Sequence, residues 1–153
     1  GRGEYDASSP QESQELFYKA IENHLAALKD IENLDERELQ GVIKKNLSVA
    51  YRSIPQMEKS LFYLNEALTD LKAVSDPSDY VSVEIADIET LRAFVLTLQN
   101  KHEETEKLLN VNLPTLDNIL GRSSFRTVKA YLLHGYNNCF RFHLQKEAAV
   151  LYH

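Results

Sequence analysis

Apolar residues recur every three or four positions along most of the chain, which is the spacing that places them on one face of an α-helix. Val81-Ser82-Val83 alternates as a strand would, but helical spacing surrounds it. The pattern therefore predicts an all-α protein of about seven helices. Their approximate ranges are 10–33, 35–53, 55–74, 80–98, 101–120, 124–141 and 143–153.

Breaks in this pattern carry the residues that usually begin or end helices. Ser9-Pro10 and Ser53-Ile54-Pro55 each supply a cap followed by a proline, which is tolerated in a first helical turn because its missing N–H has no helical acceptor there. The segment Ser75–Asp79 is rich in turn-forming residues and predicts a loop. Pro114 lies inside the fifth helix and predicts a kink or break near Val111.

The core is expected to contain the apolar residues at helical spacing. They are Phe17, Ile21, Leu25, Leu28, Ile31, Leu39, Val42, Ile43, Leu47, Ala50, Tyr51, Leu61, Leu64, Ala67, Leu68, Leu71, Val81, Ile85, Ile88, Leu91, Val95, Leu98, Leu108, Leu109, Leu113, Leu116, Phe125, Val128, Leu132, Leu133 and Tyr136.

A polar turn, a charged stretch and an apolar helix follow one another three times. The copies are 57–61, 102–108 and 145–149, and their small residues Ser60, Thr105 and Ala148 lie 45 and 43 positions apart. Such a period is typical of stacked helical hairpins, in which each unit buries its apolar face against its neighbours. The third copy requires a turn near Phe142-His143 and a short seventh helix.

The hairpin around residues 41–74 resembles a tetratricopeptide repeat, a family that alternates large, small and aromatic residues at fixed places. The matching residues are Leu47, Ser48 and Tyr51 in the first helix, and Ser60, Leu64 and Ala67 in the second. In the next copy Ala93, Leu96, Thr105 and Leu109 can be aligned, whereas Arg92 and Asn112 depart from the family pattern. The resemblance implies a right-handed α-solenoid of antiparallel hairpins that binds other proteins.

The stretch from Leu98 to Tyr152 has a turn, a helix, Pro114, an aromatic-rich helix and a short final helix in that order. This order is also similar to the N-terminal helical arms of proteasome-lid subunits, which carry a PCI module further on. This resemblance implies a structural subunit of a larger assembly. Bacterial peptide-sensing repeat proteins share this order and imply a domain whose curvature changes when a peptide binds.

Composition and length suit one soluble domain. The chain has 153 residues, of which 43% are hydrophobic and 26% charged. We expect residues 1–9 to be a disordered or cloning-derived N-terminus and residues 10–153 to be a single helical-repeat domain. Val150, Leu151 and Tyr152 resemble the apolar edge of an array cut after its last helix, so we expect the natural protein to continue.

Charge divides the chain unequally. Residues 1–122 carry 22 acidic and 13 basic side chains. Residues 123–153 carry one acidic side chain, Glu147, and four basic side chains, Arg126, Lys129, Arg141 and Lys146. An acidic body of this kind argues against a nucleic-acid or anionic-membrane partner, and no apolar run is long enough for membrane insertion. The lone Cys139 suits a reducing, intracellular compartment, cytoplasmic or nuclear.

Few residues suggest chemistry. His143 and Glu147, like His134 and Asn138, are four positions apart on a helix, but a metal site needs three or four ligands. Cys139 is interpreted as a packed thiol, although a pocket shared with either histidine would make it a candidate nucleophile. With no glycine-rich phosphate loop, we expect no cofactor, no metal and no enzymatic activity.

We therefore expect a non-catalytic scaffold that binds a partner protein or subunit, with a peptide-sensing regulator or a lid-type structural subunit as alternatives. Its contacts are expected from polar residues on the first helix of each hairpin. They are Lys44, Lys45, Asn46, Arg52, Asp87, Arg92, Arg126, Lys129 and Asn137, together with Arg141 beside an aromatic cluster. That cluster is Tyr131, Tyr136, Phe140, Phe142 and Tyr152, and it is interpreted either as core packing or as a docking patch.

Overall fold

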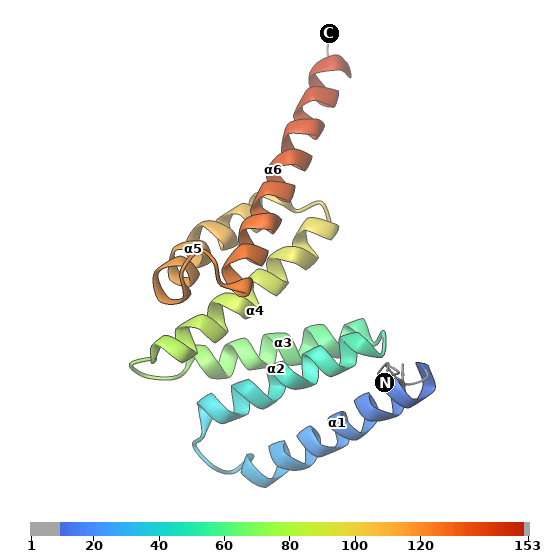
Figure 1. Cartoon of the computed structure of the whole chain (residues 1–153), viewed down its shortest axis with the longest axis vertical. Helices are drawn as coiled ribbons and strands as arrows, with labels where there is room; N and C mark the ends of the chain where they lie inside the picture. The colour runs from blue at the N-terminus through green and yellow to red at the C-terminus, as the bar shows by residue number, and fades with distance from the viewer. Residues whose placement is uncertain (1–9, 152–153) are drawn as a thin grey trace, which may run out of the picture. The chain divides into compact units, whose positions relative to one another are not determined.

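The structure is a computed structural model that describes residues 10–151, and these residues form six α-helices and no strand (Figure 1). The all-α prediction is confirmed. The helices are α1 (Pro10–Ile31), α2 (Arg37–Ser53), α3 (Met57–Lys72), α4 (Asp79–Leu98), α5 (His102–Leu120) and α6 (Phe125–Leu151). The predicted disorder of residues 1–9, and the roles given to Tyr152 and His153, lie outside the described residues.

The prediction of about seven helices is wrong by one, because α6 continues through Phe142 and His143 to Leu151. No glycine or proline occurs after Gly135 in this helix, and the segment 144–149 consists of strong helix formers, so nothing in it interrupts the backbone. The third copy of the repeated phrase is therefore part of one long helix and not the start of a new hairpin element.

The predicted break near Val111 is also wrong, because α5 continues through it and includes Pro114 as an interior residue. The helix begins twelve residues earlier at His102 and ends at Leu120. Gly121 follows as its C-cap, with a φ of 80° in the left-handed region that glycine adopts readily.

The chain divides into two compact units at the predicted loop, between Ser75 and Asp76. The first unit contains α1 to α3 and the second contains α4 to α6. The Ser78 side chain caps α4 by accepting a hydrogen bond from the backbone N–H of Val81 at 3.3 Å. Whether the two units act as one repeat domain stays a prediction.

In the first unit, α2 packs between α1 and α3, and α1 does not contact α3. The α1 side of α2 buries Ile43, Leu47 and Ala50 together with Ile21 of α1. On its other side Gly41 allows α3 to approach closely: a Cβ placed there would lie 2.6 Å from Leu71 Cγ.

The crossing of α2 and α3 is fixed by two small hydroxyl side chains. Ser60 donates to the Ser48 carbonyl oxygen at 2.8 Å, and the two hydroxyl oxygens lie 3.1 Å apart. Both serines are buried, so the hydrogen bonds satisfy groups that water cannot reach.

The hairpin of α4 and α5 repeats the hydroxyl-to-carbonyl hydrogen bond 45 positions later. Thr105 donates to the Ala93 carbonyl oxygen at 3.2 Å, as Ser60 does to Ser48. The buried positions correspond as well: Ser60, Leu64, Ala67, Leu68 and Leu71 of α3 match Thr105, Leu109, Asn112, Leu113 and Leu116 of α5. The 45-residue spacing thus marks two hairpins with the same crossing geometry.

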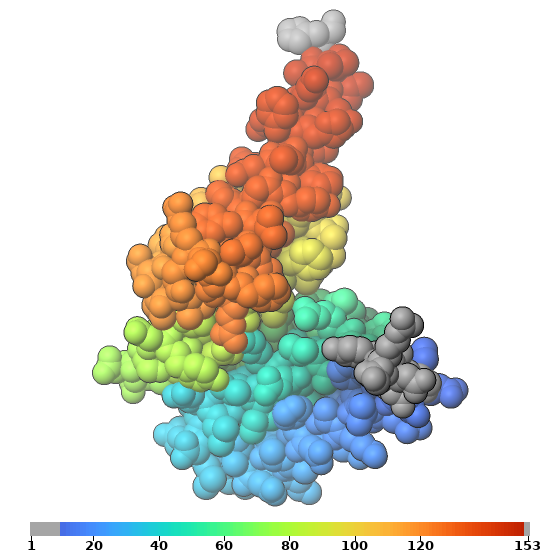
Figure 2. Space-filling model, viewed as in Figure 1, coloured from blue at the N-terminus to red at the C-terminus, as the bar shows by residue number. Residues whose placement is uncertain are grey.

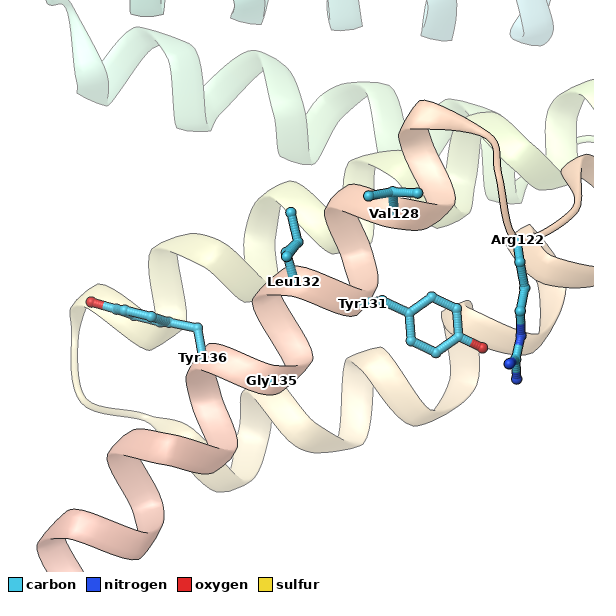
Figure 3. A pocket seen from close by; sticks show the side chains of 6 residues that line it. All are labelled: Arg122, Val128, Tyr131, Leu132, Gly135 and Tyr136. Atoms are coloured by element: carbon cyan, nitrogen blue, oxygen red, sulfur yellow. The ribbon is translucent and has the colours of Figure 1, made fainter.

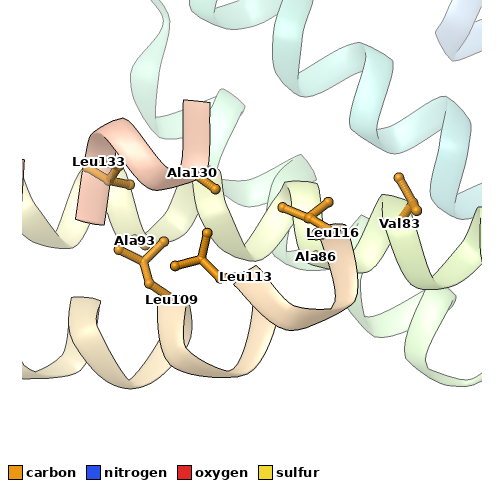
Figure 4. Close-up of a cluster of buried hydrophobic side chains, with 8 residues drawn as sticks. All are labelled: Val83, Ala86, Ala93, Leu109, Leu113, Leu116, Ala130 and Leu133. Carbon is orange, nitrogen blue, oxygen red and sulfur yellow. The ribbon is translucent and has the colours of Figure 1, made fainter. Parts of the chain in front are cut away.

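The second unit has its own core, in which α6 joins the α4–α5 hairpin (Figure 4). Leu109, Leu113 and Leu116 of α5 pack with Ala93 of α4 and Ala130 of α6. Only the first half of α6 takes part, and its buried residues end at Asn137.

Several residues expected in the core are exposed. In the first unit these are Phe17, Leu25 and Leu39, and in the second Leu98, Phe125, Val128, Leu132 and Tyr136. Four of the five in the second unit lie on α6, so the pattern overestimated how much of this helix is covered.

We expect Gly41→Ala to lower the free energy of unfolding by about 1–2 kcal/mol, because overpacking costs more than the gain in helix propensity returns. The matched control is Gly135→Ala, whose added Cβ meets nothing within 4 Å and should raise stability by up to about 1 kcal/mol. Chemical denaturation of both variants checks this, and equal effects would contradict it.

Candidate protein-interaction face

The side of α6 that faces α4 is held by ion pairs. Arg126 lies 2.7 Å from Glu84 and 4.0 Å from Asp87, and Lys129 lies 3.2 Å from Asp87. Both carboxylates are buried, whereas the two cations are partly exposed. Burial acts to lower the pKa of Arg126, but the hydrogen bond and charge of Glu84, with the charge of Asp87, outweigh it and raise that pKa above its ordinary value.

The side of α6 that faces α5 is held by a buried polar pair. Asn137 donates to the His102 backbone oxygen at 3.0 Å, and its own oxygen lies 2.8 Å from His102 Nδ1. The His102 ring stacks on Phe140 with centroids 5.8 Å apart, and its Nε2 has no hydrogen-bond partner among the described residues. Asn137 is fully buried, so the pair fixes the rotation of α6 about its axis.

Further contacts with α5 lie at the two ends of this interface. Tyr131 donates to Asp117 at 3.1 Å, and Arg122 pairs with the same carboxylate at 3.3 Å. The hydrogen bond from Arg122 to Asp117, with the neighbouring Tyr131, raises the pKa of Arg122. Arg141 pairs with Glu106. The cations of α6 are therefore largely used to attach it to its own unit.

The remaining side of α6, which we call the free face, is largely exposed, although Phe140 at its edge stacks on His102 of α5. It contains Val128, Leu132, Gly135, Tyr136, Cys139, Phe140, His143, Lys146 and Val150, which recur at helical spacing and line three successive shallow hollows. Figure 3 shows the first hollow, where Val128 and Leu132 project from consecutive turns beside Gly135. Leu132 is 70% exposed.

The C-terminal part of α6 projects beyond the other helices of its unit (Figure 2). Every residue from Phe142 to Leu151 is exposed, and Leu151 is 83% exposed. Short helices owe most of their stability to packing of an apolar face, and an uncovered apolar patch of this kind is typical of an interaction surface.

In the first unit, two of the four residues expected to bind a partner are used internally or buried. Lys44 pairs with Asp70, which also accepts a hydrogen bond from Arg37 at 3.0 Å, and Lys45 is buried. Asn46 and Arg52 are exposed on α2.

In the second unit, the expected binding residues form the internal contacts described above. Asp87, Arg126 and Lys129 join α4 to α6, and Asn137 and Arg141 join α6 to α5, while Arg92 is half-buried. Their role in binding a partner stays a prediction, and the structure gives most of them a structural role as well.

The aromatic cluster is divided between the two interpretations. Tyr131 is partly buried against the core, as core packing requires. Tyr136 and Phe140 are exposed and contact each other with ring centroids 4.6 Å apart, and Phe142 is 70% exposed, as a docking patch requires.

The residues considered for chemistry do not form a metal site within the described part of the chain. Within residues 10–151 no three His, Cys, Asp or Glu side chains come together as a metal site would require. His143 Nε2 lies 3.2 Å from Glu147. The interpretation of Cys139 as a packed thiol is wrong, because this residue lies on the exposed side of α6, in a hollow that His143 also lines. The described helices include none with the length and apolar character needed to span a membrane.

Comparison with known proteins returns no matching family model, no matching curated protein and no matching solved structure.

Sequence reasoning missed the central residues of the free face. Val128 and Leu132 were assigned to the core and Gly135 was given no role, because periodicity shows which residues share a face but not whether a neighbour covers it. The available signal was the width of the apolar arc of α6, where apolar residues occur on both sides of the helix.

We expect Arg126→Ala to lower the free energy of unfolding by about 2–3 kcal/mol, since it leaves Glu84 and Asp87 buried beside one cation fewer. Arg52→Ala is the matched control: this side chain is exposed, and removing it should change stability by less than about 0.5 kcal/mol. Urea unfolding curves measure both, and a neutral Arg126→Ala would show that the pairs do not hold α6.

We expect Asn137→Ala to lower the free energy of unfolding by about 2–3 kcal/mol, because it removes the amide that bonds the buried His102 backbone oxygen and Nδ1. The control is Asn138→Ala, at the adjacent exposed position. Thermal unfolding distinguishes them, and equal midpoints for the two variants would contradict the prediction.

Proposed function

We propose that the protein is a non-catalytic interaction module whose free face on α6 binds another protein. The observation that carries this proposal is the uncovered apolar surface from Val128 to Val150, which has open hollows along its length. Interaction surfaces of this kind bury aromatic and aliphatic anchors at their centre and keep charges at the rim.

The polar networks support the same assignment. Arg126, Lys129, Asn137 and Arg141 fix the first part of α6 against α4 and α5, so the free face from Val128 to Phe140 is presented in one orientation. A preformed surface loses less conformational entropy when a partner binds. The part of the free face from Val128 to Phe140 therefore lies on a stretch of helix that is fixed from behind.

We further propose that the hairpins stack as a right-handed, tetratricopeptide-like solenoid. The support is the 45-residue correspondence between Ser60–Ser48 in one hairpin and Thr105–Ala93 in the other. Repeated hairpins with one crossing geometry favour a regular array. Small-angle X-ray scattering tests this arrangement, and a scattering profile of a closed globule would contradict it.

Leu132→Glu tests the binding proposal. The substitution places a charge at the centre of the free face, and Leu132 is exposed, so we expect stability to change by less than about 1 kcal/mol. A photo-crosslinking amino acid at position 136 should capture a stoichiometric partner from the source cells in the otherwise unchanged protein, and at least 10-fold less of it in Leu132→Glu.

The matched control carries Asn46→Glu on the exposed surface of α2. It should retain the crosslinked partner. Equal capture by all three proteins, or no capture by any, would contradict binding through the free face.

A further inference from the structure

One buried nitrogen of the second unit lacks the hydrogen bond that buried polar atoms normally make. His102 is 6% exposed, and its Nε2 is the one enclosed side-chain nitrogen or oxygen within residues 10–151 that has no hydrogen-bond partner there. Such atoms are rare in folded proteins, and each calls for an explanation. Because this nitrogen belongs to an imidazole, it can make the contact around it sensitive to pH.

The hydrogen bonds of Asn137 fix which nitrogen of the His102 ring carries the hydrogen. The Asn137 amide nitrogen donates to the His102 backbone oxygen at 3.0 Å, so the amide oxygen is the atom that lies 2.8 Å from Nδ1. An amide oxygen only accepts hydrogen bonds, so Nδ1 carries a hydrogen and Nε2 of the neutral ring carries none. Nε2 is therefore the atom to which a further proton adds.

A proton on Nε2 does not fit the closed contact. It converts Nε2 into a positively charged donor at a place where no acceptor of the described residues lies within hydrogen-bond distance. The ring is also stacked on Phe140, with centroids 5.8 Å apart. A buried charge without a partner is strongly unfavourable, so the ring has to reach water before it can hold this proton.

The charged groups beside the ring do not provide an acceptor for this proton. The charged and titratable side chains nearest to it along α5 and α6 are Lys101, Glu103, Glu106, His134 and Arg141. Glu106, one turn after His102, pairs with Arg141. Lys101 and Glu103 are exposed, and the last turn of α4 contains no titratable residue.

We propose that His102, Asn137 and Phe140 form a pH-sensitive latch, which holds α6 on α5 while the ring is neutral and releases it when Nε2 takes up a proton. Asn137 is the last buried residue of α6, and every residue from Phe142 to Leu151 is exposed. Release of the latch therefore loosens α6 from Asn137 onward. This inference goes beyond the proposed function, because it concerns the attachment of α6 and is tested without a partner.

The sign of the pH dependence follows from which form binds the proton. The released form takes up a proton that the closed form excludes, so the released form becomes more populated as the pH falls. A free imidazole gains its proton near a pH of about 6.5. The ratio of released to closed protein is therefore expected to rise about 10-fold between about pH 7.5 and about pH 5.5.

Hydrogen exchange of the whole chain, followed by mass spectrometry, measures this ratio as a protection factor. The protection factors of the α6 amides from Leu133 to Arg141 should fall about 10-fold over this pH range. Those of α2, which contains no histidine, serve as the internal reference and should stay constant. An equal change in α2 and α6, or no change in either, would overturn the proposal.

His102→Asn removes the titrating ring but keeps a side-chain N–H that can donate to Asn137 in place of Nδ1. Loss of the ring should lower the α6 protection factors overall, while their change with pH should shrink to less than about 2-fold. The matched control is His134→Asn, at a partly buried position one turn before Asn137, which should keep the full change. The same pH dependence in His102→Asn as in the unchanged protein would contradict the latch.

NMR titration of the unchanged protein gives a second test that needs no variant to fold. Proton uptake by the His102 ring should coincide with loss of the hydrogen-bonded signal of the Asn137 side-chain amide. Proton uptake that leaves this signal in place would show that the contact tolerates the charge, and would overturn the proposal.

Discussion

The rotation of α6 about its own axis is the constraint on which the second unit depends. Glu84 and Asp87 of α4 hold Arg126 and Lys129 on one side of this helix, and the buried pair of His102 and Asn137 holds another. Buried ion pairs add little net stability because both partners lose water, but they penalise any arrangement that separates them. In this protein they decide which residues of α6 face solvent.

The unequal distribution of charge along the chain is explained by ion pairs within the second unit. The basic segment 123–153 and the acidic segment before it suggest two surfaces that attract different partners. Arg126 and Arg141 instead pair with Glu84 and Glu106 of their own unit, so much of the opposite charge is neutralised where α6 packs. What α6 offers outward is mainly an apolar face, with charge concentrated near its end at Lys146.

The two hairpins show how little sequence identity a repeated geometry needs. Ser48 and Ala93 differ, yet each supplies a backbone carbonyl oxygen to a hydroxyl twelve residues later, from Ser60 and Thr105. The bond uses the backbone of the first helix, so only a small side chain is required there. The same tolerance explains why Asn112 can replace a small apolar residue, since its amide donates to Glu89 at 2.6 Å.

The sequence by itself determined that the chain is helical, where five of its helices begin and end, and that Ser60 and Thr105 hold equivalent places. Those features depend on local preferences: helical periodicity, turn residues and small side chains at regular spacing. The predicted cap at Ser53 is wrong, because Ser53 ends α2 and α3 begins at Met57 after Gln56, whose side chain makes no capping hydrogen bond. It did not determine that α6 runs uninterrupted through Phe142, because a turn there was inferred from a repeat and not from a helix-breaking residue. Only the tertiary structure decided that Leu132 is exposed while Leu133 is buried, since a residue's burial depends on whether a neighbouring helix covers it, and α4 and α5 cover only part of α6.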